Sequence, residues 1–219
     1  MAFDIMFRQL LPGMGASVSI FVLTLLFSLP LGLLVAFAKM SKIKPLQWIT
    51  KFYISIMRGT PLMLQLMVVY FGPYFIFGIR ISMGYSLIAV FIAFTINYAA
   101  YFAEIYRGGI ESMPVGQYEA AKILGYSKAQ TFFRIILPQV FKRILPSITN
   151  EVITLVKDTS LAANITVTEM FMVTQRIVAR TYEPLLLYLE VGLIYLIFST
   201  VLTWVQRFGE KKLASYGHK

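Results

Sequence analysis

The chain has 219 residues, of which 58% are hydrophobic and only 14% carry a charged side chain, and its mean hydropathy is +0.73. This composition leaves too few polar residues to cover a soluble globule of that length, so it indicates an integral membrane protein. The sequence contains no cysteine and a single histidine, which excludes disulfides and thiol chemistry and argues against a metal site.

Apolar segments predict five transmembrane helices in one all-α domain that occupies residues 1–219. The first segment lies between Arg8 and Lys39, and two more flank Arg80; none of the three contains a charged residue. Each is long enough to cross about 30 Å of hydrocarbon. Two later segments are interrupted by ionisable side chains. The expected spans are residues 15–38, 55–78, 84–106, 144–168 and 184–206.

Lysine and arginine are distributed unevenly between the two sides that these spans define. The first and third loops and the C-terminal tail carry fifteen of them, and the opposite side carries four: Arg8, Arg80, Arg176 and Arg180. Because positive loops stay cytoplasmic, we expect the N-terminus outside and the C-terminus in the cytoplasm. The net charge of +10 is then explained by topology and by anionic membrane lipid rather than by nucleic acid.

The polar insertion between the third and fourth spans contains helix signals with defined ends. Pro114 precedes a first helix, and Gly125 stands where a helix C-terminus favours positive φ. Ser127 and Gln130 have the spacing of a capping box at the start of a second helix, which Pro138 is expected to end.

Residues 114–138 are therefore predicted to form a helix-turn-helix docking element. The small residues Ala120, Ala121 and Gly125 would let another backbone approach closely, and Glu119 could pair with a cation. The alternative is an ordinary amphipathic loop helix.

The spacing E-A-A-x₃-G-x₉-I-x-L-P, from Glu119 to Pro138, resembles the cytoplasmic coupling loop in the permease subunits of bacterial ABC importers. Four further strings are typical of the polar-amino-acid branch of that family, and the resemblance covers roughly residues 15–207. They are R-G-T-P at 58–61, A-E-I-Y-R-G-G-I at 103–110, G-Q at 116–117 and K-D-T-S-L at 157–161.

The resemblance implies a type I importer permease in the bacterial inner membrane that carries basic or polar amino acids such as arginine, histidine, lysine or glutamine. Its implied partners are an identical or paralogous permease, two ATPase subunits and an external substrate-binding protein. The chain lacks a G-x-x-x-x-G-K-[ST] phosphate loop, so ATP and Mg²⁺ are expected on the ATPase, and no cofactor, metal or enzyme activity is expected here. The resemblance assigns ATPase coupling to Glu119, Ala120, Ala121, Leu124, Gly125 and Tyr126.

Two polar stripes follow one helical face each on neighbouring spans. They consist of Asn97, Tyr101 and Glu104 on the third span and Glu151, Thr154 and Asp158 on the fourth. We expect them to line a shared substrate cavity, since ionisable groups in a membrane mark pathways or pairing partners. Because no arginine is expected on that face, the electric field of the carboxylates should be negative. It should therefore favour a transported amino acid with a cationic side chain. The alternative is structural pairing of Glu104 with Arg107 and of Glu151 with Lys157.

The fourth span is also rich in hydroxyls around Ser160, a further candidate substrate ligand. These hydroxyls can compete with the backbone hydrogen bonds, which predicts a helix break near residues 158–161. The alternative is an unbroken helix in which the hydroxyls donate to the helix's own backbone carbonyls. A second function remains open for the carboxylates Glu104, Glu151 and Asp158, as the proton relay of a proton-coupled amino acid transporter. Substrate specificity could also lie wholly in the external binding protein.

Overall fold

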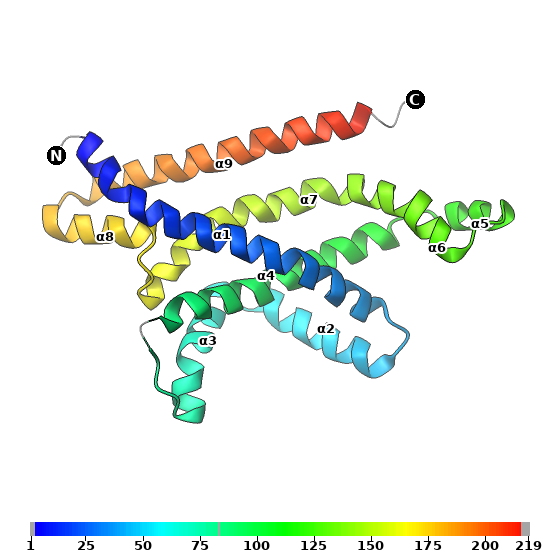
Figure 1. Cartoon of the computed structure of the whole chain (residues 1–219), viewed down its shortest axis with the longest axis horizontal. Coiled ribbons are helices and arrows are strands. Elements are labelled where there is room, and N and C mark those ends of the chain that lie inside the picture. Colours follow the sequence, from blue (N-terminus) through cyan, green and yellow to red (C-terminus); the bar gives the residue numbers. More distant parts are fainter. Residues whose placement is uncertain (1–2, 83, 216–219) are drawn as a thin grey trace.

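The structure is a computed structural model that describes the backbone of residues 3–82 and 84–215, with side chains from Arg8 to Gly209 apart from residue 83. The described residues form helices and no strands, which confirms the all-α class (Figure 1). The elements are α1 (Phe3–Met40), α2 (Lys44–Gly59), α3 (Leu62–Phe77), α4 (Tyr85–Glu111), α5 (Val115–Ile123), α6 (Lys128–Gln130), the π-helical η1 (Thr131–Ile136), α7 (Leu137–Asp158), the 3-10 helix η2 (Thr159–Ile165), α8 (Met170–Thr181) and α9 (Pro184–Ser215).

Three helices of the described chain, α1, α4 and α9, are each long and apolar enough to cross a membrane. The pair α2 and α3 provides a fourth candidate, but the two helices meet at an angle of 110°. The expected span over residues 55–78 therefore covers the end of α2, the bend and α3, and it stays a prediction. Pro61 disfavours helical geometry at the preceding residue, and Thr60 is extended, with φ −125° and ψ 150°.

The fourth predicted span corresponds to α7 and η2. α7 is too polar to count among the apolar helices, because it carries Lys142, Arg143, Glu151, Lys157 and Asp158. The α-helix ends at Asp158 and continues as 3-10 helix, so the expected break near residues 158–161 is confirmed. The alternative also holds, since the hydroxyls of Thr159 and Ser160 donate to the carbonyls three residues before them, each at 2.8 Å.

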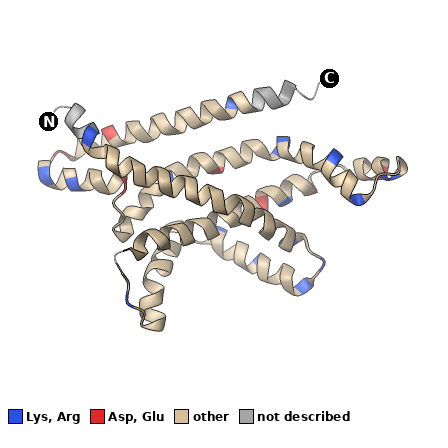
Figure 2. Cartoon of the chain, viewed as in Figure 1, with Lys and Arg blue, Asp and Glu red and all other residues tan. Residues whose placement is uncertain are grey.

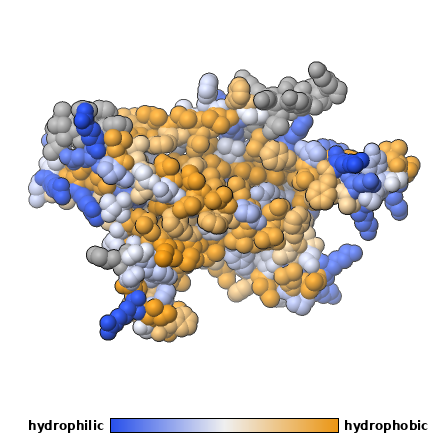
Figure 3. Space-filling view, in the orientation of Figure 1, coloured by the Kyte–Doolittle hydropathy of each residue, from blue (hydrophilic) through white to orange (hydrophobic). Residues whose placement is uncertain are grey.

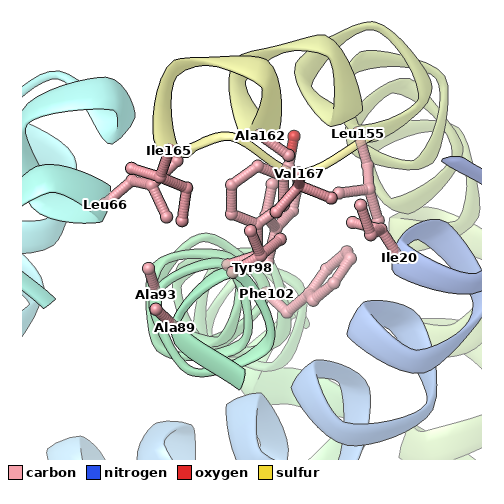
Figure 4. Packing of buried hydrophobic residues seen from close by; sticks show 12 residues of the cluster. Ile20, Leu66, Ala89, Ala93, Tyr98, Phe102, Leu155, Ala162, Ile165 and Val167 are labelled. Carbon is pink, nitrogen blue, oxygen red and sulfur yellow. The ribbon is translucent and has the colours of Figure 1, made fainter. Parts of the chain in front are cut away.

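The main core surrounds α4. Its Tyr98 and Phe102 rings are buried between Leu66 of α3 and both Ile20 of α1 and Leu155 of α7 (Figure 4). The second half of α1 packs on α4, where Ala36 is buried with Ala100 and Ala103. Their close approach depends on Gly32, where a Cβ would lie 2.8 Å from the Phe102 Cβ. α4 is thus the central helix on which the other elements are placed.

Charged and apolar residues occupy different parts of the surface. Lysine and arginine gather toward the two ends of the long helices (Figure 2), and the surface between them is mostly apolar (Figure 3). Outward-facing side chains of α9 illustrate this band, with Leu196, Val201 and Trp204 at 60%, 54% and 74% exposed. Such a belt of exposed apolar side chains fits contact with lipid.

Single-cysteine labelling tests the orientation in the membrane, which stays a prediction. Ile79 and Leu185 belong to the side predicted to be external, and Ile43 and Ile123 to the side predicted to be cytoplasmic; all four are more than half exposed. In intact cells, a membrane-impermeant thiol reagent should label cysteine at Ile79 or Leu185 and spare cysteine at Ile43 or Ile123. Lysed cells serve as the control, where all four should react, and the opposite pattern in intact cells would reverse the topology.

Candidate functional site

The predicted docking element forms a compact tip beyond the ends of α4 and α7 (Figure 1). Gly125 has φ +77°, and the chain leaves α5 through a Schellman motif. The Gly125 N–H donates to the Lys122 carbonyl at 3.1 Å, and the Tyr126 N–H donates to the Ala121 carbonyl at 3.0 Å. The predicted glycine-dependent helix end is therefore confirmed.

The second helix of the tip begins with the predicted capping box. The Gln130 N–H donates to the Ser127 hydroxyl at 3.3 Å, and the Ser127 N–H donates to the Gln130 side chain at 2.9 Å. The amide groups of Gln117 and Gln139 exchange two hydrogen bonds of 2.9 Å. These contacts hold α5 against the base of α7, so the tip is a defined structure rather than a loose loop.

Pro138 does not end this second helix, contrary to the sequence prediction. The chain continues as one helical run through α6, η1 and α7. Around the proline the bonding is π-helical, and the Leu137 N–H reaches the Phe132 carbonyl five residues back. The wider turn accommodates a residue without an N–H, and Pro138 then occupies the first turn of α7, where its missing donor costs least.

The tip exposes a different set of residues from the one predicted. Glu119, Ala120 and Gly125 are exposed, but Ala121 is only 1% exposed, so its small side chain lets α5 pack inward and cannot meet an external partner. Three apolar residues stand out instead: Val115, Ile123 and Leu124, at 70%, 86% and 73% exposed. Only Leu124 was named beforehand. Val115 and Ile123 could have been found from the amphipathic pattern of α5. Exposed apolar side chains at such a tip indicate a contact with another protein.

Asn97 is a structural residue, so its assignment to substrate binding is corrected. It is 4% exposed, and its side-chain amide donates to the Met57 carbonyl at 3.0 Å and to the Gln65 side chain at 2.8 Å. Residue 61, which would normally donate to that carbonyl within a helix, is a proline and has no N–H. Asn97 thus completes the bend between α2 and α3.

Glu104 is held by cations from three helices. Its carboxylate hydrogen-bonds Lys39 of α1, and it pairs with Arg107 one turn along α4 at 2.8 Å. The predicted pairing of Glu104 with Arg107 is confirmed. Arg58 of α2 lies farther away, with its Nη1 3.8 Å from Oε2 of Glu104.

Arg58 also lies against Tyr101 of the first stripe. Its guanidinium carbon lies 5.4 Å from the centre of the Tyr101 ring, in cation–π geometry. It is near enough to Glu151 to interact with that carboxylate electrostatically. The premise that no arginine lies on this face is therefore wrong, because the bend after α2 brings Arg58 there from a distant part of the sequence. Among the described residues, no ion pair joins Glu151 to Lys157.

The rest of the fourth-span stripe lies at the end of α7. Asp158 accepts a hydrogen bond of 2.7 Å from the Tyr98 hydroxyl through Oδ2, and no described residue donates to its Oδ1. The hydroxyls of Thr154 and Ser160 donate to the carbonyls of Asn150 and Lys157, at 3.0 and 2.8 Å. Both hydroxyl protons are donated to backbone carbonyls, so these hydroxyls can accept a hydrogen bond from a ligand but cannot donate one.

Of the residues in the two stripes, Glu104 lines a hollow in the described part of the chain. This hollow, of about 300 Å³, lies between α4 and α7 and is lined in part by Glu104, Gly108, Arg143 and Ser147. A second cavity, of about 290 Å³, is lined almost entirely by apolar side chains of α1, α7, α8 and α9. Within residues 8–82 and 84–209, no three His, Cys, Asp or Glu side chains are grouped as metal ligands.

An all-helical bundle with polar side chains on its inner helices and a belt of exposed apolar side chains is the arrangement expected of a membrane-embedded transport subunit. The chain belongs to the family of binding-protein-dependent transport system inner membrane components, whose pattern it matches over residues 28–215. Its relatives place it among the permeases of amino acid ABC importers.

Two relatives from Bacillus subtilis illustrate the similarity. The chain is 40% identical to the L-cystine transport system permease protein TcyB over 93% of its own length and 86% of that protein. It is 37% identical to the arginine transport system permease protein ArtQ over 94% and 93% of the two chains. A crystal structure of an amino acid ABC transporter with histidines superposes with a TM-score of 0.88 at 31% identity, covering 97% of this chain and 99% of that one. The MetNI methionine transporter, at 16% identity and a TM-score of 0.71, shares the fold.

Proposed function

We propose that this protein is the permease subunit of an ATP-driven importer for basic or polar amino acids such as arginine, histidine, lysine or glutamine. The observation that carries the proposal is the rigid tip of α5 and α6, with Ile123 and Leu124 facing outward. A proton-coupled transporter would need no such docking element, and the relatives lend that alternative no support.

The partners proposed are a second permease, identical or paralogous, two ATPase subunits and an external substrate-binding protein. ATP and Mg²⁺ would be bound by the ATPase subunits, leaving this chain without catalytic residues. The N-terminus would face the outside of the inner membrane, and the tip would face the cytoplasm, where it would enter a cleft of the ATPase.

The helical run from Lys128 to Asp158 offers a mechanical link between the ATPase and the substrate. It joins the tip to the polar stripe without a break in helical structure, over about 45 Å at 1.5 Å per residue. Closure of the ATPase subunits would move the tip, and the run would carry that movement to Asp158 as a rigid body. Glu119, Ala120, Leu124, Gly125 and Tyr126 remain the proposed docking residues.

Substitution of Gly125 tests the docking assignment. Gly125→Arg should leave the protein in the membrane but reduce ATP-dependent uptake at least about tenfold, because a long side chain at the tip blocks close approach and the positive φ is strained. The measurement is uptake and ATPase co-purification with the reconstituted complex. Gly125→Asn is the matched control, since asparagine tolerates positive φ and stays small. Native uptake and assembly in the Arg variant would remove the docking assignment.

Selectivity for a cationic side chain would come from Asp158. Its Oδ1 lacks a donor among the described residues, and it lies two turns, about 10 Å, along α7 from Glu151. That separation suits an amino acid with a long side chain. A carboxylate and a guanidinium about 4 Å apart attract by on the order of 4 kcal/mol at an effective dielectric near 20, before desolvation is subtracted.

Exchange of this carboxylate tests the selectivity. With a binding protein that accepts both substrates, Asp158→Asn should lower arginine uptake relative to glutamine uptake by about tenfold, which corresponds to about 1.4 kcal/mol. Glu183→Gln, which neutralises an exposed carboxylate away from the stripes, should leave the ratio unchanged. An unaltered ratio in Asp158→Asn would mean that specificity lies in the binding protein.

A further inference from the structure

The cavity of about 290 Å³ between α1, α7, α8 and α9 contains no residue of either polar stripe. α1 and α9 start close together, where Leu10 and Leu187 belong to one buried cluster, and they separate toward their C-terminal ends (Figure 1). The cavity lies in the space that opens between these two helices. The binding of an amino acid to the stripes therefore does not explain it.

One end of the cavity is held together by hydrogen bonds to Glu169. Gly13 lets α1 approach the first residue of α8, since a Cβ there would lie 2.8 Å from the Met170 Cα. The Glu169 carboxylate is fully buried. It accepts hydrogen bonds from Ser17 of α1 at 3.3 Å and from Tyr195 of α9 at 3.4 Å. At this end, α1 and α9 are therefore tied to the same buried residue.

The cavity offers no free polar group to a ligand. Its lining contains three hydroxyls, and all of them are hydrogen-bonded within the protein: those of Ser17 and Tyr195 to Glu169, and that of Thr159 to the Val156 carbonyl at 2.8 Å. The other lining side chains are apolar. A buried water needs two to four polar partners, and an apolar cavity of about 150 Å³ engineered in another protein stays dry and binds benzene. The chemistry of this lining therefore calls for an apolar occupant.

The cavity opens onto the belt of apolar side chains that faces lipid. Its rims include Val18 and Val22 of α1 and Val201 of α9, each of which is about half exposed. They lie within Arg8–Met40 and Pro184–Gly209, two stretches that are long and apolar enough to cross a membrane. The surface around them is mostly apolar (Figure 3). The groups with access to the cavity are therefore those found in the hydrocarbon part of the bilayer.

The size of the cavity favours a single hydrocarbon chain. One turn of an α-helix, about 10 Å wide and 5.4 Å long, takes up roughly 420 Å³, so a helix of a second permease is too large to enter. An acyl chain is narrower, and the bilayer supplies it in excess. Without an occupant the lining atoms would lack contacts on one side, which is destabilising.

We infer that this cavity is a binding site for one acyl chain of a membrane phospholipid. The chain enters between α1 and α9 and contacts Val156 and Met170, which lie on either side of η2. It thereby supports the segment in which the α-helix of the fourth span gives way to 3-10 helix. The site is separate from the one proposed for the transported amino acid.

Filling the cavity with side chains tests this inference. The double variant Val18→Phe/Val201→Phe adds two rings to the lining. The matched control is Leu26→Phe/Val205→Phe, at exposed positions of the same two helices that do not line the cavity. Native mass spectrometry of the purified complex, titrated with phosphatidylethanolamine, measures the lipid bound. The native complex and the control should bind one lipid per copy of this chain saturably, and the cavity-filled variant should bind it at least about tenfold more weakly.

Changes in the lipid identify the part that is recognised. Phosphatidylglycerol with the same acyl chains should bind within about twofold of phosphatidylethanolamine, because the cavity has no free polar group for a headgroup. Dihexanoyl phosphatidylethanolamine should bind at least about tenfold more weakly, because each missing methylene removes apolar contact. Removal of lipid should lower the unfolding temperature of the native complex and of the control more than that of the cavity-filled variant, in which the added rings replace the chain.

Equal lipid binding by the native and the cavity-filled complexes would overturn the assignment, as would binding that depends on the headgroup and not on chain length. If the double variant does not fold, the single variants Val18→Phe and Val201→Phe and the chain-length comparison on the native complex decide the question. The chain has no native cysteine, so a benzophenone can be attached at Val22→Cys. Cross-linking to phospholipid supports the site, and cross-linking to a second permease in its place contradicts it.

Discussion

The missing N–H of Pro61 is the constraint on which the arrangement of this protein depends. A helix that ran through residue 61 would leave the Met57 carbonyl without its donor. The chain instead turns by 110° between α2 and α3, and the side chains of Asn97 and Gln65 both donate to that carbonyl at 3.0 Å. In a membrane, where water cannot replace the lost bond, this compensation makes the bend tolerable.

The bend determines what meets at the polar face of α4. α2 stops at Gly59, and Arg58 in its last turn is directed toward Tyr101 and Glu104. Lys39 and Arg107 already neutralise Glu104 and tie α1 to α4, so the charge of Arg58 remains directed at the face that also carries Glu151. Pro61 thus explains both the bend between α2 and α3 and the presence of the Arg58 charge at the candidate substrate site.

Local signals in the sequence were sufficient for some features and not for others. The Gly125 helix end, the Ser127 capping box and the break after Asp158 depend on neighbouring residues, and all three are confirmed. Pro138 was misjudged because a π turn before it removes the clash. The burial of Ala121 and Asn97 and the approach of Arg58 depend on contacts between distant segments, which spacing along one helix cannot reveal.

Spin-label distances across the bend test this account most directly. The chain has no native cysteine, so labels can be placed at Lys51→Cys on α2 and Val68→Cys on α3, both of which are exposed. In the native background the interlabel distance should be narrowly distributed, and Asn97→Leu should broaden it because the Met57 carbonyl loses a donor. Asn150→Leu, at an exposed asparagine on α7, should leave it narrow. An Asn97→Leu distribution identical to the native one would show that the bend does not depend on this hydrogen bond.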